Sequence, residues 1–237
     1  MKKAGAYPDR LTQDETPDLP ISSAPAKVVI PTRISGEDLG RILSLSDGVF
    51  AFAMTLLVLS LTVPFIPGAS NRPPVDVSER LAYLLQQDWS VFTAYAFAFV
   101  MIGVWWVVHN RTFQYIARYD SALVWINLAM LMQIAVMPFV LGVFSDYSNT
   151  QTGVCLFAGI QVTLGLTSTL MWDYARRRKL LKPTVPVPVQ EYFSRRGYFT
   201  SAVFAVSIAV SFVSISGAEL VWILTFVVQR YLANHGD

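Results

Sequence analysis

Charged side chains are scarce in this sequence. Asp, Glu, Lys and Arg make up 14% of the chain and apolar residues make up 54%, whereas a soluble domain has about 25% charged residues. So few charges cannot cover the surface of a water-soluble fold that contains this much apolar material. The composition therefore predicts a membrane protein whose apolar side chains face lipid or other helices.

Cysteine and histidine are rarer still. The single cysteine, Cys155, excludes an internal disulfide and any CxxC pair, and its apolar surroundings in the sequence favour a buried structural thiol. Two histidines are too few for a zinc site, so no metal is predicted. The sequence also has no Gly-rich phosphate loop, no visible catalytic triad and no basic patch for nucleic acid. We predict a protein that is not an enzyme and has no cofactor and no nucleic-acid partner.

Long apolar runs dominate what the sequence does contain. Residues 1–38 are rich in proline and mixed in charge, which predicts a disordered tail, and residues 234–237 form a short second tail. Between them the sequence predicts an all-α, polytopic membrane domain over residues 39–233. Its six transmembrane helices are predicted at residues 39–64, 85–110, 120–145, 151–175, 197–214 and 217–233, with an extended Pro-rich connector at 182–188.

Basic residues lie almost entirely on one side of this six-helix arrangement. Among all lysines and arginines, only Arg72 and Arg80 fall on the other side. Cytoplasmic loops carry the excess of Lys and Arg, so both termini are predicted to be cytoplasmic. The basic run at 176–182 is explained either by this orientation alone or by contact with anionic membrane lipid.

The first apolar segment carries charged residues at its start. Arg41 and Asp47 lead directly into a membrane-length helix, and a charge in the hydrocarbon costs about 2.5–3.5 kcal/mol on insertion scales. Asp47 is interpreted either as a titrating group in a proton path or as a hydrogen-bond partner that holds the helix in place. Its candidate partners are Ser44, Ser46, His109 and Asp120.

One face of the same helix is nearly all apolar. At about 100° per residue, several side chains lie within about 60° of Phe52, while Asp47 points almost the opposite way. These residues are Leu45, Gly48, Thr55, Leu56, Leu59 and Val63. Taken alone, such a stripe indicates either plain packing or the wall of a pore.

A motif at this helix resembles a known family. The residues Arg41, Ser46, Asp47 and Gly48 fit the pattern Arg-x-x-x-Phe-Ser-Asp-Gly, with Leu45 in place of phenylalanine. Further similar fragments lie at 106–111, at Asp120 and at 125–128. On these residues the chain resembles the transmembrane protein 175 family, whose best-known member is a lysosomal potassium channel, over about residues 39–233.

The resemblance implies a bacterial, single-repeat member of this family. Such a protein is a homotetramer in the bacterial cell membrane, with a central pore lined by the first helix and with potassium and other monovalent cations as permeant ions. The resemblance places a pore constriction at Phe52, Leu56 and Leu59 and a pore threonine at Thr55. At the position of Phe52 the family usually has Ile or Leu. The resemblance also implies a structural network of Arg41, Ser46, Asp47, Gly48, His109 and Asp120.

A hydrophobic constriction is the expected source of selectivity. The sequence contains no Thr-Val-Gly-Tyr-Gly filter, so a cage of backbone carbonyls is not available. A narrow apolar ring forces partial dehydration, which is less unfavourable for potassium than for sodium, and its wetting and dewetting can act as a gate. The alternative is a proton-coupled or small-solute transporter that uses Asp47 and His109.

Overall fold

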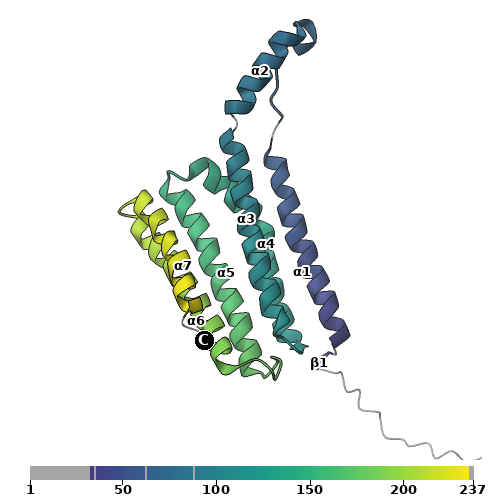
Figure 1. Cartoon of the computed structure of the whole chain (residues 1–237), viewed down its shortest axis with the longest axis vertical. Helices are drawn as coiled ribbons and strands as arrows, with labels where there is room; N and C mark the ends of the chain where they lie inside the picture. Colours follow the sequence, from purple (N-terminus) through teal and green to yellow (C-terminus); the bar gives the residue numbers. More distant parts are fainter. Residues whose placement is uncertain (1–32, 35, 62, 88, 235–237) are drawn as a thin grey trace, which may run out of the picture. The chain divides into compact units, whose positions relative to one another are not determined.

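The computed structural model describes residues 33–34, 36–61, 63–87 and 89–234 (Figure 1). The predicted tails 1–38 and 234–237 lie largely outside these residues. Within the described part the chain forms seven α-helices, which are α1 (Gly36–Leu56), α2 (Pro74–Gln87), α3 (Trp89–Gln114), α4 (Ser121–Tyr147), α5 (Gln151–Arg177), α6 (Val187–Ser211) and α7 (Ile215–Asn234). It also forms two short strands, β1 (Arg33–Ile34) and β2 (Tyr119–Asp120), and two 3₁₀ turns, η1 (Leu57–Ser60) and η2 (Ala69–Asn71).

Four helical segments of the described residues are long and apolar enough to cross a membrane. They are Leu39–Leu59, Trp89–Gln114, Ser121–Tyr147 and Gln151–Arg177. The helix α6 is not among them because Glu191, Arg195 and Arg196 lie in its first half. In α7, the described apolar segment Ile215–Thr225 is shorter than a membrane span. The chain is therefore an all-α, polytopic membrane protein, as predicted.

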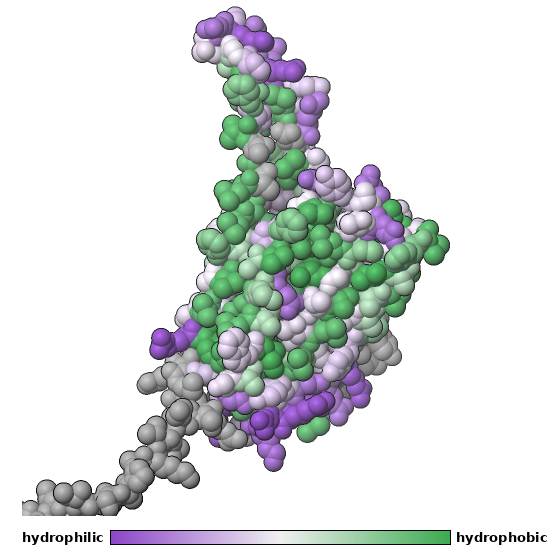
Figure 2. Space-filling view, turned by 180° about the vertical axis from the view of Figure 1, so that it is seen from behind, coloured by the Kyte–Doolittle hydropathy of each residue, from purple (hydrophilic) through white to green (hydrophobic). Residues whose placement is uncertain are grey.

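The helices pack side by side in a simple order. The helix α1 packs on α3 and α4, α4 packs on α5, and α5 packs on the antiparallel pair α6 and α7 (Figure 1). Buried apolar side chains, among them Ile102, Ile134 and Leu164, fill the space between them. One face of these helices is mainly hydrophobic, and hydrophilic residues gather where α5 ends and α6 begins and again over α2 (Figure 2).

The connections α3–α4 and α5–α6 meet at one end of the helices. Ile116 forms an antiparallel bridge with Leu181, and the amide of Lys182 donates to the carbonyl of Tyr115 over 2.8 Å. At the same end β1 pairs with β2, with Arg33 opposite Asp120. The start of α1 and two basic connections therefore share one end, while α2 lies beyond the other end (Figure 1).

The elements differ from the prediction in three places. The first helix was predicted to end at residue 64, but α1 ends at Leu56 and the 3₁₀ turn after it ends at Ser60. The predicted extended connector 182–188 ends early, because Pro186 is the N-cap of α6 and the helix begins at Val187, ten residues before the predicted start at 197. Proline is favoured at a helix start since its fixed φ suits the first turn. The helix α2 was not predicted, and it is amphipathic, with no buried residue.

Candidate functional site

The helix α1 has two apolar faces that differ in exposure. Phe50 and Leu57 are 1% and 4% exposed, and with Ser46 and Ala53 they form the face that packs on α3 and α4. Their spacing of three or four residues is that of a single helical face. The rest of the chain leaves most of the second face exposed.

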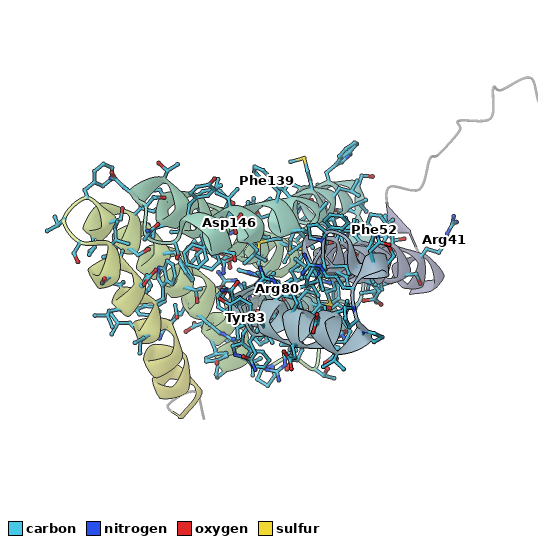
Figure 3. The ribbon with its side chains drawn as sticks, turned by 90° about the horizontal axis from the view of Figure 1, so that it is seen from above. Arg41, Phe52, Arg80, Tyr83, Phe139 and Asp146 are labelled. Atoms are coloured by element: carbon cyan, nitrogen blue, oxygen red, sulfur yellow. The ribbon has the colours of Figure 1, made fainter. Side chains whose placement is uncertain are left out.

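This second face contains the predicted stripe. Phe52 is 65% exposed and Leu59 is 74% exposed, and Leu45, Gly48, Thr55 and Val63 are exposed as well, while Leu56 is half-buried. A groove runs along part of this face, with Ala135 of α4 as its wall on the neighbouring helix. Figure 3 shows Phe52 on α1, at the edge of the helices. We call the residues Leu45, Gly48, Phe52, Thr55, Leu56, Leu59 and Val63 the exposed stripe of α1.

Thr55 is the single hydroxyl-bearing residue in the exposed stripe. Its Oγ1 donates a hydrogen bond to the carbonyl of Phe52, 2.9 Å away. A hydroxyl that has donated its hydrogen keeps oxygen lone pairs available as acceptors. The Thr55 oxygen can therefore face a cation, whereas the other side chains of the stripe offer only hydrocarbon.

Behind the stripe, three helices are joined by a chain of polar contacts. Ser46 of α1 accepts a hydrogen bond from Nδ2 of Asn127 on α4 over 3.1 Å, and Nε2 of His109 on α3 lies 2.8 Å from Oδ1 of Asn127. Since that oxygen is an acceptor, His109 must carry its proton on Nε2. All three side chains are buried. The other ring nitrogen of His109, Nδ1, is buried and has no hydrogen-bond partner among the described residues.

Asp47 takes part in a different contact. Its Oδ1 accepts a hydrogen bond from the indole Nε1 of Trp106 on α3 over 2.8 Å. Among the described residues no hydrogen bond joins Asp47 to its candidate partners Ser44, Ser46, His109 and Asp120. Ser46 donates to the carbonyl of Ile42, and Ser44 donates to that of Gly40. Asp47 nevertheless ties α1 to a neighbouring helix of its own chain.

The remaining residues of the predicted network lie apart from this contact. Asp120 caps α4 by accepting from the amide of Leu123 and also accepts from the hydroxyl of Tyr174 over 2.8 Å. Gly48 is exposed and lies in the stripe. Arg41 is exposed and extends from α1 away from the other helices (Figure 3). The structure thus brings Ser46 and His109 together through Asn127, and leaves Arg41, Gly48 and Asp120 outside that chain of contacts.

The sequence predicts an interhelical hydrogen bond for Asn127, which the structure shows, but it gives neither the partners of Asn127 nor the contact of Trp106. Trp106 lies in a fragment that resembles the family, and Asn127 is a polar residue inside an apolar segment, so each carried a signal. Neither signal says which helices lie side by side or at what height. That information comes from the packing of α3 and α4 against α1.

Known proteins are similar to this chain in sequence and in the arrangement of their helices. Residues 41–138 match the family described as the endosomal/lysosomal potassium channel TMEM175. A potassium channel of Streptomyces collinus is 31% identical over 180 residues, which cover 74% of this chain and 83% of that protein. The chain belongs to the transmembrane protein 175 (TMEM175) family. The predicted family is confirmed, and it is a family of ion channels rather than of enzymes.

Other members of the TMEM175 family align over most of their length. A potassium channel of Chamaesiphon minutus is 29% identical over 201 residues, which cover 82% of this chain and 93% of that channel. The crystal structure of a lysosomal potassium-selective channel TMEM175 homolog from the same organism superimposes with a TM-score of 0.62 and 27% identity. The superposition covers 85% of this chain and 99% of the chain in that crystal structure. The fold described above is thus that of a TMEM175 protein.

Proposed function

We propose that this TMEM175 protein is a potassium-permeable cation channel whose ion path is lined by the exposed stripe of α1. The observation that carries the proposal is that α1 buries one apolar face within its own chain and leaves a second apolar face uncovered, with Thr55 in it. Similar proteins from Streptomyces and Chamaesiphon are named potassium channels, which supports the same permeant ion here.

The proposed channel is a homotetramer with six membrane-crossing helices per subunit and both termini in the cytoplasm. The helices α6 and α7 are the fifth and sixth spans, since they lie antiparallel and pack on α5, which is apolar enough to cross a membrane by itself. The basic end formed by Arg111, Arg118 and the α5–α6 connection is the cytoplasmic one by the positive-inside rule.

Selectivity arises in this proposal from dehydration at an apolar ring. Phe52, Leu56 and Leu59 from four subunits form the constriction, which excludes water when it is narrow and so also acts as the gate. One turn from Phe52, the Thr55 oxygens keep their lone pairs toward the axis and replace part of the hydration of a potassium ion. Sodium loses more than potassium when water is removed, so the ring passes potassium preferentially.

Reversal potentials test this proposal directly. The purified parent protein and the variants Phe52→Ala and Thr55→Val are recorded in planar bilayers under opposed potassium and sodium gradients. The parent is expected to reverse near the potassium potential. Phe52→Ala should raise the conductance and move the reversal potential toward zero, because a wider ring no longer demands dehydration. Thr55→Val keeps the side-chain shape, so it should lower potassium preference without changing assembly.

A matched control separates the stripe from other exposed aromatic positions. Phe212 at the end of α6 is 73% exposed, and Phe212→Ala should change neither conductance nor reversal potential. If Phe52→Ala and Thr55→Val also leave both quantities unchanged, the stripe packs against protein or lipid and the pore assignment fails. A parent protein that carries no potassium current would overturn the proposed function itself.

A proton-coupled or small-solute transporter remains the second candidate because one observation favours it. The buried Nδ1 of His109 has no partner among the described residues, and an unpaired buried acceptor is a place where a proton can bind. The structure does not join this nitrogen to Asp47, which bonds to Trp106 instead. A transporter would show saturable, pH-coupled flux that His109→Gln abolishes, whereas a channel shows unitary currents.

A further inference from the structure

A pocket lies between α3, α5 and α6, away from α1. Its walls are apolar and aromatic, with Val104 and Trp105 from α3, Trp172 from α5 and Phe193 from α6. Its volume is about 90 Å³, whereas about 10–15 Å³ by the same measure holds one water molecule. The pocket therefore has room for a group the size of a phosphate.

Two arginines line this pocket, one on each of two helices. Arg111 lies in the last turn of α3 and Arg196 lies in α6. No acidic side chain lines the pocket. Asp173, on a neighbouring turn of α5, accepts from Ser194 and Tyr198 and lies 3.6 Å from Arg176. The pocket is thus a cationic site, and guanidinium groups match the geometry of phosphate oxygens.

A hydroxyl group lies in the same pocket. Ser168 of α5 is largely buried as a residue and lines the pocket. Its hydroxyl can donate a hydrogen bond to an oxygen atom bound there. A ligand oxygen in the pocket would accept this hydrogen bond.

The walls around Ser168 are held rigidly. A Cβ on Gly197 of α6 would lie 1.9 Å from Oγ1 of Thr169, and a Cβ on Gly165 of α5 would lie 2.3 Å from Oγ of Ser201. The two helices are therefore in close contact through small residues. Trp172 is fixed as well, because its Nε1 donates to the carbonyl of Gln190 and its ring stacks on Phe193 at 4.6 Å. A rigid pocket loses little entropy when it binds a ligand.

From this geometry we propose that the pocket between α3, α5 and α6 binds a phosphate group, as carried by an anionic phospholipid or by a soluble phosphate. Arg111 and Arg196 bind the phosphate oxygens and Ser168 donates a third hydrogen bond. Apolar side chains beside the cationic groups suit a headgroup that continues into acyl chains. Arg111 lies in the last turn of α3 and Arg196 in the first half of α6, near the basic connections, where anionic lipid gathers. The proposal does not depend on ion conduction.

Native mass spectrometry of the full-length protein in neutral detergent tests this binding. Phosphatidylglycerol and phosphatidylcholine with the same acyl chains are titrated separately, and inorganic phosphate is then added as a competitor. The variants are the pair Arg111→Gln with Arg196→Gln, and Ser168→Ala alone. The control pair is Arg177→Gln with Lys179→Gln, which removes two exposed charges at the same end without touching the pocket.

The parent should bind phosphatidylglycerol more tightly than phosphatidylcholine, and the pocket pair should weaken that binding by about tenfold or more. Ser168→Ala should weaken it by about threefold, and the control pair should have almost no effect. Displacement of the lipid by millimolar phosphate identifies a soluble anion as the ligand, and lack of displacement identifies the lipid.

Two results would overturn the proposal. One is equal binding of the two lipids with no binding of phosphate. The other is a control pair that weakens phosphatidylglycerol binding as much as the pocket pair does, which would mean general attraction to a basic surface. If the pocket pair fails to fold, Ser168→Ala decides alone, because it removes only one oxygen atom, and unchanged binding by this variant counts against the site.

Discussion

At the scale of single residues, Asn127 of α4 joins α1 to two neighbouring helices. Its side-chain amide donates a hydrogen bond to Ser46 of α1 and accepts one from His109 of α3. In lipid no water is present to replace such contacts, so a polar side chain that joins three helices fixes their relative heights. The exposed stripe keeps its direction because the opposite face of α1 is held in this way.

Asn127→Leu should lower the stability of the purified protein. The substitution keeps the approximate volume but leaves the Nε2–H of His109 without its acceptor, which costs about 1–3 kcal/mol for a buried group. Ser46 loses the hydrogen bond from Asn127 but keeps its bond to the carbonyl of Ile42. The melting temperature in detergent measures the loss. Asn149→Leu, at an exposed position in the turn after α4, is the control. Equal melting temperatures for both variants would show that the contact carries no stability.

Asp47 and Trp106 should behave as a coupled pair. The indole of Trp106 donates to Asp47, so Asp47→Ala and Trp106→Phe remove the same contact from opposite sides. A double-mutant cycle in the free energy of unfolding should give a coupling of about 1 kcal/mol. Asp47→Ala should also lower the yield of intact oligomer more than it changes ion selectivity, because its contact lies within the subunit. Additive effects with normal oligomer yield would contradict this role.

At the scale of elements, α5 and α6 approach each other through two glycines. The Cβ positions of Gly165 and Gly197 are occupied by Ser201 and Thr169 of the facing helix. Since packing between helices in lipid relies on van der Waals contact rather than on the hydrophobic effect, such close approach is a main source of their association. Any side chain at these positions forces the two helices apart.

Gly197→Ala should therefore destabilise the protein, while Gly159→Ala on α5 should not, because a Cβ on Gly159 meets nothing within 4 Å. Overpacking of this kind costs about 1–3 kcal/mol. The melting temperature measures it, and Thr169→Ala should restore part of the loss in Gly197→Ala, since it removes the Oγ1 that clashes. A Gly197→Ala variant as stable as Gly159→Ala would refute the close contact.

The elements show how far sequence reasoning reached. The apolar runs gave the bounds of α3, α4 and α5 to within four residues, because the length of an apolar run predicts the length of a span. They gave the start of α1 equally well but not its end, since the predicted helix runs to residue 64 and α1 ends at Leu56. The start of α6 was missed since Arg195 and Arg196 interrupt its apolar run, although charges at a helix end outside the hydrocarbon do not stop a helix. An interhelical hydrogen bond was predicted for Asn127, but its partners and the contact between Trp106 and Asp47 were not, because they depend on the relative heights of three helices.

At the scale of the whole molecule, the basic connections gather at one end. The bridge between Ile116 and Leu181 and the pairing of β1 with β2 join three segments that are far apart in the sequence. The positive-inside rule concerns loops on the same side of a membrane, and the backbone pairing brings the α3–α4 and α5–α6 connections together independently of charge. The two arguments predict the same side for these loops.

Cysteine labelling should locate these sides, because the sequence contains only Cys155. In a Cys155→Ser background, Ser70→Cys before α2 and Lys182→Cys in the α5–α6 connection each place one thiol at an exposed position. A membrane-impermeant maleimide should label Ser70→Cys in intact cells and Lys182→Cys only in inverted vesicles. Labelling of both from the same side would exclude the proposed topology.

The 3₁₀ turn at the end of α1 changes the direction of the stripe. Leu56 closes the α-helix and Leu59 lies in η1 (Leu57–Ser60). Three residues advance by about 300° in an α-helix but by about 360° in a 3₁₀ helix, so Leu59 lies directly above Leu56, about 6 Å further along the axis. A substitution that continued the α-helix through η1 would turn Leu59 by about 60° away from Leu56 without altering any side chain of the stripe. The winding of the backbone at this turn thus determines whether the Leu56 ring and the Leu59 ring of the proposed constriction are aligned along the pore axis.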